Sequence, residues 1–81
     1  MMKRPHVIHF SDAIALLESG QRVSIKVWKM STGDIIHYND CICIGQHRRG
    51  GTHMIECAGS SLVREFRDVT LFEINGLEIY R

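Results

Sequence analysis

The sequence contains little proline, few aromatic residues and almost no net charge. It has one proline in 81 residues, aromatic residues make up 7%, and the hydrophobic fraction is 44%. This composition is typical of a globular chain and excludes disordered and collagen-like classes. Ten Lys plus Arg against nine Asp plus Glu give a net charge of +1. No global field therefore attracts nucleic acid or an anionic membrane, and a charged partner must meet a local patch.

Long apolar runs are also missing. No run approaches the roughly 18 apolar residues of a membrane helix, and His9, Asp12 and Glu18 interrupt the segment after the basic amino terminus. The cysteine count is three, an odd number that cannot form a fully paired disulfide framework. We therefore expect a cytoplasmic protein with reduced thiols, no membrane segment and a single small domain over residues 1–81.

One short helix is predicted over residues 11–19. Ser11 is a candidate N-cap, and Gly20 suits the left-handed position beyond the C-terminus of the helix. Ile14 and Leu17 belong to an apolar stripe with helical spacing. A helix this short is marginal in water by itself, so we expect it to pack on a sheet.

Most of the remaining chain has the period-two pattern of strands. Residues 23–28 alternate between apolar and polar side chains, and residues 35–44 and 52–58 are rich in residues that favour strands. A bulge is expected near Asn39–Asp40. The first nine residues have no helical period and indicate an entry segment or a short edge strand.

The strongest local signal is Asn75-Gly76, which lies between two alternating runs. Both residues tolerate positive φ, so a two-residue hairpin turn is expected, with Ile74 opposite Leu77. The segment before this hairpin, residues 62–68, fits either a short helical turn or an irregular strand.

Together these elements predict an α+β or mainly β fold: one N-terminal helix packed on a five-stranded antiparallel SH3-like sheet or small barrel. The last strand is expected to be a free sheet edge unless barrel closure by Val7–Phe10 or by the first strand protects it, so the protein is expected to be a monomer or a weak homodimer. The predicted core consists of large apolar residues: Ile14, Leu17, Val23, Ile25, Val27, Ile36, Ile42, Ile44, Ile55, Leu71, Phe72, Ile74 and Ile79.

A recurring layout of apolar residues and glycines covers most of the chain and includes Phe10-x-x-Ala13, Gly20-x-x-Val23-x-Ile25 and Asn75-Gly76-x-x-Ile79-Tyr80. This layout resembles small uncharacterised proteins of Bacteroidetes-type genomes and their phage or conjugative elements. The resemblance implies a bacterial mobile-element protein with an SH3-like barrel, and it carries no catalytic residues with it.

The leading functional hypothesis is a non-enzymatic interaction or structural module that binds a protein partner through a β-barrel surface. Aromatic residues dominate the energetics of protein interfaces, and paired arginines can hold a carboxylate. The interaction candidates are Trp28, Tyr38, Tyr80, Arg64 and Arg67.

Nucleic-acid binding is the alternative hypothesis. An aromatic residue flanked by cations can stack a base while arginines hold phosphates. The candidates are Arg22, Lys26 and Trp28 on the outward face of one strand and Arg48 and Arg49 in a glycine-rich loop. A solvated strand face explains the first two cations equally well.

A structural metal site is the third hypothesis, because thiolate and imidazole are preferred zinc ligands. Its candidates are Cys41, Cys43, His53 and Cys57. Cys41 and Cys43 lie within one predicted strand, where no tight turn wraps a metal, so packing of the cysteines in the core is the favoured interpretation. No nucleophile motif, phosphate-binding glycine pattern or enclosed carboxylate pair occurs, and we expect no enzymatic activity and no cofactor.

Overall fold

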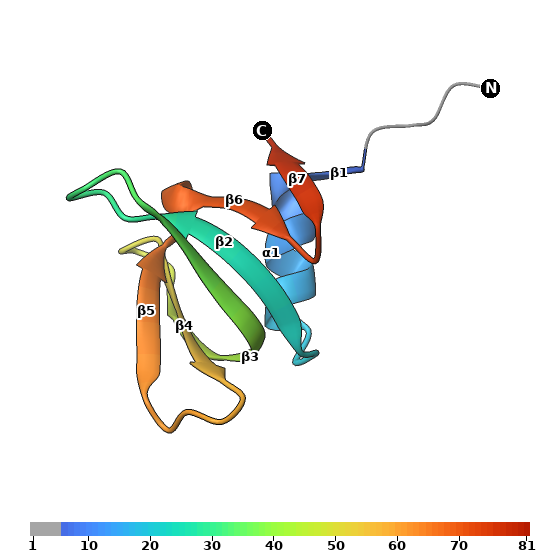
Figure 1. The fold of residues 1–81 in the computed structure, drawn as a ribbon. Coiled ribbons are helices and arrows are strands. Elements are labelled where there is room, and N and C mark those ends of the chain that lie inside the picture. Colours follow the sequence, from blue (N-terminus) through green and yellow to red (C-terminus); the bar gives the residue numbers. More distant parts are fainter. Residues whose placement is uncertain (1–5) are drawn as a thin grey trace.

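The computed structural model describes residues 6–81 and shows one twisted seven-stranded sheet with a short helix against it (Figure 1). The strands lie in the order β1-β7-β6-β2-β3-β4-β5, and β1 and β7 are the only parallel neighbours in this described sheet. In chain order the elements are β1 (Val7–His9), α1 (Phe10–Glu18), β2 (Val23–Trp28), β3 (Ile35–His47), β4 (Thr52–Cys57), β5 (Val63–Arg67), the 3-10 helix η1 (Asp68–Thr70), β6 (Leu71–Ile74) and β7 (Leu77–Tyr80).

The predicted five-stranded antiparallel SH3-like sheet or barrel is wrong. The protein is mainly β, with seven strands in one mixed sheet that does not close, since β1 and β5 are its two edges. Two short strands, β1 and β5, account for the difference between the predicted and the observed sheet. β1 has three residues and becomes a strand only by pairing with β7, and the ambiguous segment before the last hairpin divides into β5 and η1.

The helix α1 forms where the apolar stripe predicts it, but its N-cap is different. The helix begins at Phe10, and the ring nitrogen Nδ1 of His9 accepts a hydrogen bond from the backbone N–H of Ser11 at 3.1 Å. Ser11 is therefore inside the first turn and is not the cap. At the other end Gly20 adopts φ +86°, as expected. Ala13 and Leu17 are fully buried against the sheet.

The predicted bulge near Asn39–Asp40 is confirmed, and it shapes the sheet. Val23 pairs with Cys41 whereas Ile25 pairs with Tyr38, so β3 carries an additional residue at this point. Asp40 adopts φ +53°, and its backbone N–H donates to Ser24 Oγ at 3.1 Å. Residues 35–38 of β3 pair with β2, Cys41 pairs with both β2 and β4, and the residues beyond Cys41 pair with β4.

The buried core agrees with the prediction at Leu17, Val23, Ile25, Val27, Ile55, Leu71 and Ile74. Five other predicted members are only partly buried: Ile14, Ile36, Ile42, Phe72 and Ile79. Ile44 is wrong, because it is the extra residue of a second bulge between β3 and β4 and is 50% exposed. Cys41 is fully buried, in agreement with the favoured interpretation of the cysteines as core residues. The predicted core omits Ala13 and Phe66 and the buried polar residues His53 and Thr70.

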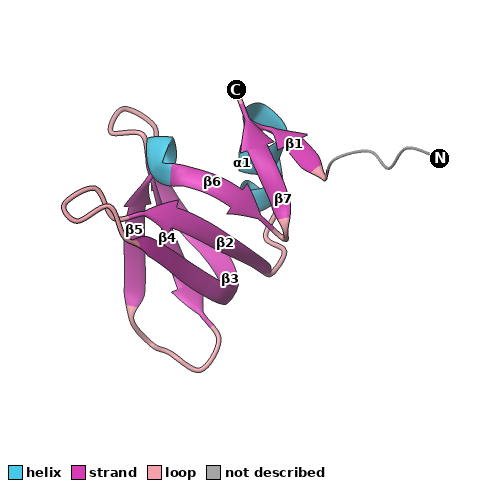
Figure 2. Ribbon diagram, turned by 45° about the horizontal axis from the view of Figure 1, so that its top comes forward, coloured by secondary structure: helices cyan, strands magenta, loops and turns pink. Residues whose placement is uncertain are grey.

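The expectation of a free edge at the last strand is also wrong, because β7 lies between β6 and β1 (Figure 2). The N–H of Glu78 donates to the carbonyl of His6 at 3.0 Å. The segment Val7–Phe10 thus protects this strand, although no barrel closes. A weak homodimer formed by pairing β7 with β7 of a second copy therefore lacks the free edge that it requires. Among residues 6–81, no helix combines the length and the apolar character needed to cross a membrane.

The Asn75-Gly76 hairpin is confirmed. Ile74 pairs with Leu77, and Asn75 and Gly76 adopt φ +50° and +80°. The Oδ1 atom of Asn75 also accepts from the backbone N–H of Ser24 at 2.9 Å, which joins the turn to the start of β2.

Replacing Gly76 with alanine should destabilise the protein by about 1 kcal/mol, because a Cβ disfavours the left-handed backbone. Thermal unfolding should show a melting temperature lower by about 4–8 °C. Gly50→Ala is the matched control, since Gly50 has no positive φ and its added Cβ meets only ordinary contacts. Equal melting temperatures for the two variants would contradict this hairpin geometry.

Candidate functional site

A groove of about 240 Å³ opens between the β2–β3 hairpin and β5. Its floor includes the buried residues Val27 and Phe66, so the groove reaches the edge of the hydrophobic core. Its walls carry aromatic, aliphatic and charged side chains. The remaining lining residues are Trp28, Lys29, Met30, Ile36, Tyr38, Glu65, Arg67 and Thr70.

Trp28 is held at this groove by the end of β2 and by a bulge in β6. Lys26 pairs with Glu73 whereas Val27 pairs with Leu71, so Phe72 is the extra residue of β6. Its ring lies 4.8 Å from that of Trp28, centroid to centroid. One side of the indole is thus supported by packing while Trp28 as a whole remains 45% exposed.

The groove runs beside the unpaired edge of β5, which bonds only to β4. The N–H of Asp68 donates to the carbonyl of Gly51 at 2.7 Å at the end of this ladder. The backbone N–H and C=O groups of successive residues in a strand point to opposite sides. Those of Phe66 therefore point toward β4, and those of Glu65 point away from it. The edge therefore offers backbone donors and acceptors to an extended chain.

A second, basic pocket of about 700 Å³ lies at the β3–β4 turn and the end of β5. Register places Thr52 opposite Arg67 and so brings residues of the turn beside β5. Arg48 contacts Glu18 at 3.5 Å, and Glu65 accepts from Thr52 Oγ1 at 3.1 Å. Within residues 6–81, the two other arginines of the pocket form no ion pair. The full lining is Gln46, His47, Arg48, Arg49, Gly50, Thr52, Glu65 and Arg67.

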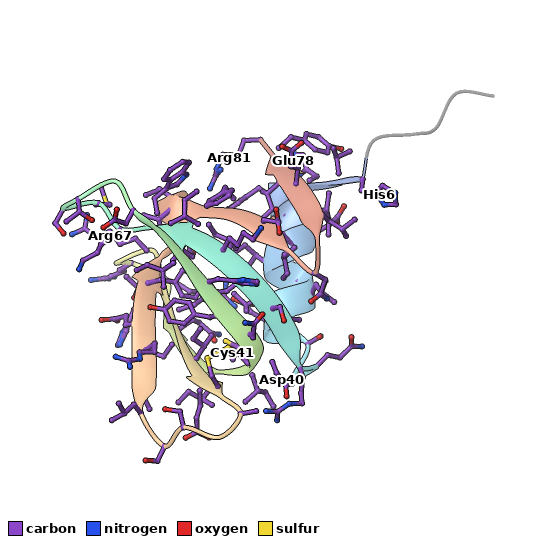
Figure 3. The ribbon with its side chains drawn as sticks, viewed as in Figure 1. His6, Asp40, Cys41, Arg67, Glu78 and Arg81 are labelled. Carbon is purple, nitrogen blue, oxygen red and sulfur yellow. A yellow bond between two sulfur atoms is a disulfide. The ribbon has the colours of Figure 1, made fainter. Side chains whose placement is uncertain are left out.

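The five residues of the nucleic-acid hypothesis do not form one surface. Arg22 pairs with Asp40 at 2.6 Å, and Lys26 pairs with Glu73 at 3.2 Å. Both cations are therefore already neutralised by neighbours. Figure 3 shows Asp40 and Arg67 at different ends of the sheet, which separates the Arg22 pair from the basic pocket.

The residues of the protein-interaction hypothesis are also divided. Trp28, Tyr38 and Arg67 line the groove. Tyr80 lies on β7, where its ring meets that of His9 edge-on at 5.2 Å. Arg64 is exposed on β5 and lines neither the groove nor the basic pocket. Only the first three therefore belong to one site.

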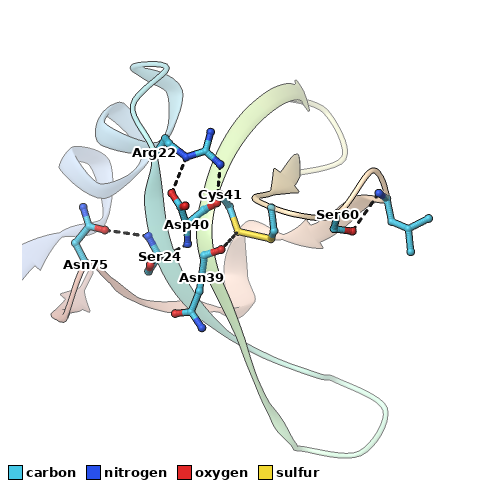
Figure 4. Close-up of a disulfide and its surroundings, with 9 residues drawn as sticks. Arg22, Ser24, Asn39, Asp40, Cys41, Ser60 and Asn75 are labelled. Carbon is cyan, nitrogen blue, oxygen red and sulfur yellow. Dashed lines mark hydrogen bonds and ion pairs between the residues drawn. A yellow bond between two sulfur atoms is a disulfide. The ribbon is translucent and has the colours of Figure 1, made fainter.

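The cysteines are arranged differently from the expectation of three reduced thiols. Cys41 and Cys57 are directly opposite each other on β3 and β4 and form a disulfide (Figure 4). Cys43 is a free thiol whose nearest polar partner is the carbonyl of Gly45 at 3.5 Å. In this form two of the candidate metal ligands are consumed by the bond. No cluster of metal-binding side chains occurs among the described residues, 6–81.

His53, the remaining metal candidate, instead joins three elements. It is 3% exposed, its Nδ1 lies 2.5 Å from Asp68 Oδ1, and its Nε2 lies 2.7 Å from Glu18 Oε2. Each ring nitrogen thus lies within hydrogen-bond distance of one carboxylate, and an imidazole N–H donates to a carboxylate oxygen. This cluster fastens α1 and η1 to β4. No spacing in the sequence indicates this cluster, because Asp68 and Glu18 lie 15 and 35 residues from His53 along the chain.

No protein-family model, curated protein or solved structure matches this chain. The resemblance to mobile-element proteins therefore stays a prediction.

The disulfide predicts a specific alkylation pattern. Unfolded but non-reduced protein should take up one iodoacetamide group, at Cys43, whereas reduced protein should take up three, as measured by mass spectrometry. Reduction should also lower the free energy of unfolding by about 2–4 kcal/mol, since Cys41 and Cys57 close a loop in the unfolded chain. Uptake of three groups without reductant would contradict the bond.

Replacing His53 with alanine should cost about 1–3 kcal/mol, because two partly buried carboxylates lose their donor. Chemical denaturation measures this loss. His37→Ala is the matched control, since His37 is an exposed histidine of β3. If both variants unfold at the same denaturant concentration, the cluster does not hold the helix to the sheet.

Proposed function

We propose that this domain is a non-enzymatic interaction module that binds an extended segment of a partner protein in the groove between the β2–β3 hairpin and β5. The observation that carries the proposal is the coincidence of an aromatic-lined groove with an unpaired strand edge. The groove supplies a place for one large apolar side chain, and the edge supplies backbone hydrogen bonds to the segment that bears it.

Exposed apolar side chains support this choice of surface. Trp28 is 45% exposed and Met30 66%, and both line the groove. A cluster of large apolar side chains left in water is typical of an interaction site. Aromatic residues contribute large contact areas with few rotatable bonds, so they form effective anchor pockets.

Nucleic-acid binding has less support. Its stacking residue, Trp28, has one ring face against Phe72, and three of its four cations form ion pairs: Arg22 with Asp40, Lys26 with Glu73 and Arg48 with Glu18. Arg49 remains as a candidate at the basic pocket.

The proposal is tested by panning a random peptide display library against the intact domain and measuring affinities of the selected peptides by fluorescence anisotropy. We expect peptides with a common aromatic or large aliphatic anchor. Tyr38→Ala and Met30→Ser should each weaken binding by about tenfold or more, since both side chains line the groove.

Tyr80→Ala is the matched control, because Tyr80 is a partly exposed tyrosine on a strand far along the sheet order from β5. It should leave affinity unchanged. Circular dichroism establishes that each variant is folded before its affinity is compared. The proposal is wrong if no peptide is enriched, or if the selected peptides bind all three variants as tightly as the original protein.

A further inference from the structure

We infer that the partner segment is acidic: beside its apolar anchor it carries a carboxylate or phosphate group that binds in the basic pocket at the β3–β4 turn. This inference rests on the proposed function and adds the chemistry of the ligand. It starts from one fact of geometry, which is that Glu65 and Arg67 line both the groove and the basic pocket. The two sites therefore share a wall and can be occupied by one chain.

The basic pocket has a surplus of positive charge. Three arginines, Arg48, Arg49 and Arg67, face one carboxylate, Glu65. Arg48 is balanced by Glu18, which it contacts at 3.5 Å, and Glu65 accepts from the hydroxyl of Thr52 and forms no ion pair with an arginine among residues 6–81. Arg49 and Arg67 thus remain as two guanidinium groups without an ion pair among the described residues. Guanidinium binds carboxylate and phosphate through two parallel hydrogen bonds, so this pair suits an anionic oxygen group.

Because both sites include Glu65 and Arg67 in their lining, neighbouring positions of one extended peptide can reach both of them. Glu65 and Arg67 are two residues apart on β5, and side chains on one face of a strand repeat at about 6.6 Å. A segment lying along the edge of β5 repeats its own side chains with the same period. When one side chain of the peptide binds in the groove, the peptide side chain two or four positions along therefore lies next to Arg67 and Arg49.

An acidic peptide fits these sites better than a nucleic-acid strand. The groove floor is aliphatic and aromatic and reaches the buried core, which suits an apolar side chain. A phosphate backbone must run past Glu65, which stands on the wall between the two sites and repels it. A peptide places one anionic group beyond Glu65 and a neutral backbone beside it.

The test compares display selections on three forms of the intact domain: the original protein, Arg49→Glu and Arg64→Gln. Peptides selected on the original protein should combine the anchor with aspartate or glutamate two or four positions away. On Arg49→Glu the anchor should persist, the acidic preference should disappear, and lysine or arginine should take its place. Arg64→Gln should select the same peptides as the original protein, because Arg64 is an exposed cation on β5 outside both sites.

A second measurement follows the anion alone. Pyrophosphate titrated into the labelled protein should shift the side-chain NMR signals of Arg49 and Arg67 and leave those of Arg64 unchanged. Synthetic versions of one selected peptide, carrying serine, glutamate or phosphoserine at the acidic position, then distinguish the two anion sources. Glutamate and phosphoserine should each bind at least about fivefold more tightly than serine, and increased salt should reduce this difference.

The outcomes separate the two claims. Anchored peptides without any acidic preference would overturn the inference and leave the proposed function standing. Absence of any anchored peptide would overturn both claims, and shifts from pyrophosphate would then show an anion site with no peptide role. An eight-residue oligothymidine that binds tightly, loses affinity in Arg49→Glu and is not displaced by a selected peptide would favour nucleic acid and overturn the inference.

Discussion

The bend of β3 is the feature on which the rest of the structure depends. One strand of thirteen residues pairs mainly with β2 before its bulge and with β4 after it, and Cys41 pairs with both, so the sheet changes direction within a single strand. The left-handed backbone of Asp40 makes this possible, and Ser24 and Arg22 bind Asp40 through its N–H and its carboxylate. Because the two halves of the sheet are turned relative to each other, a small chain can enclose a core with only one short helix. The same bend carries β4 and β5 past the β2–β3 hairpin, which creates the groove.

The candidate site is thus a product of an open sheet. If β5 were paired on both sides, no backbone edge would be available beside the groove. In the observed arrangement β5 remains an edge, and its residues Glu65 and Arg67 form a wall between an apolar groove and a basic pocket. A long unpaired edge invites aggregation, and charged residues on such an edge discourage it. The charged residues Arg64, Glu65 and Arg67 of β5 fit this purpose.

Two cross-links compensate for the small size of the core. The disulfide joins β3 to β4 immediately after the bend, and the His53 cluster joins β4 to α1 and η1. A domain of about 80 residues buries a modest fraction of its surface, so covalent and charge-assisted links contribute a large share of its stability. Both links include a residue of β4, the strand that pairs with β5, and none of their residues lines the groove. They stabilise the frame and leave the groove unobstructed.

The sequence by itself determined the local elements: the apolar stripe of α1, the alternation in β2, the bulge at Asp40 and the hairpin at Asn75-Gly76. Each of these depends on residues close together in the chain, where spacing and backbone preference are sufficient. It also singled out Trp28, Tyr38 and Arg67 as interaction candidates. Only the tertiary structure decided the sheet order, the parallel partner that makes β1 a strand, the pairing of Cys41 with Cys57 and the burial of His53 between two carboxylates. Those features join residues that are far apart in the sequence. Local spacing and backbone preference do not indicate which distant side chains come into contact in the folded chain.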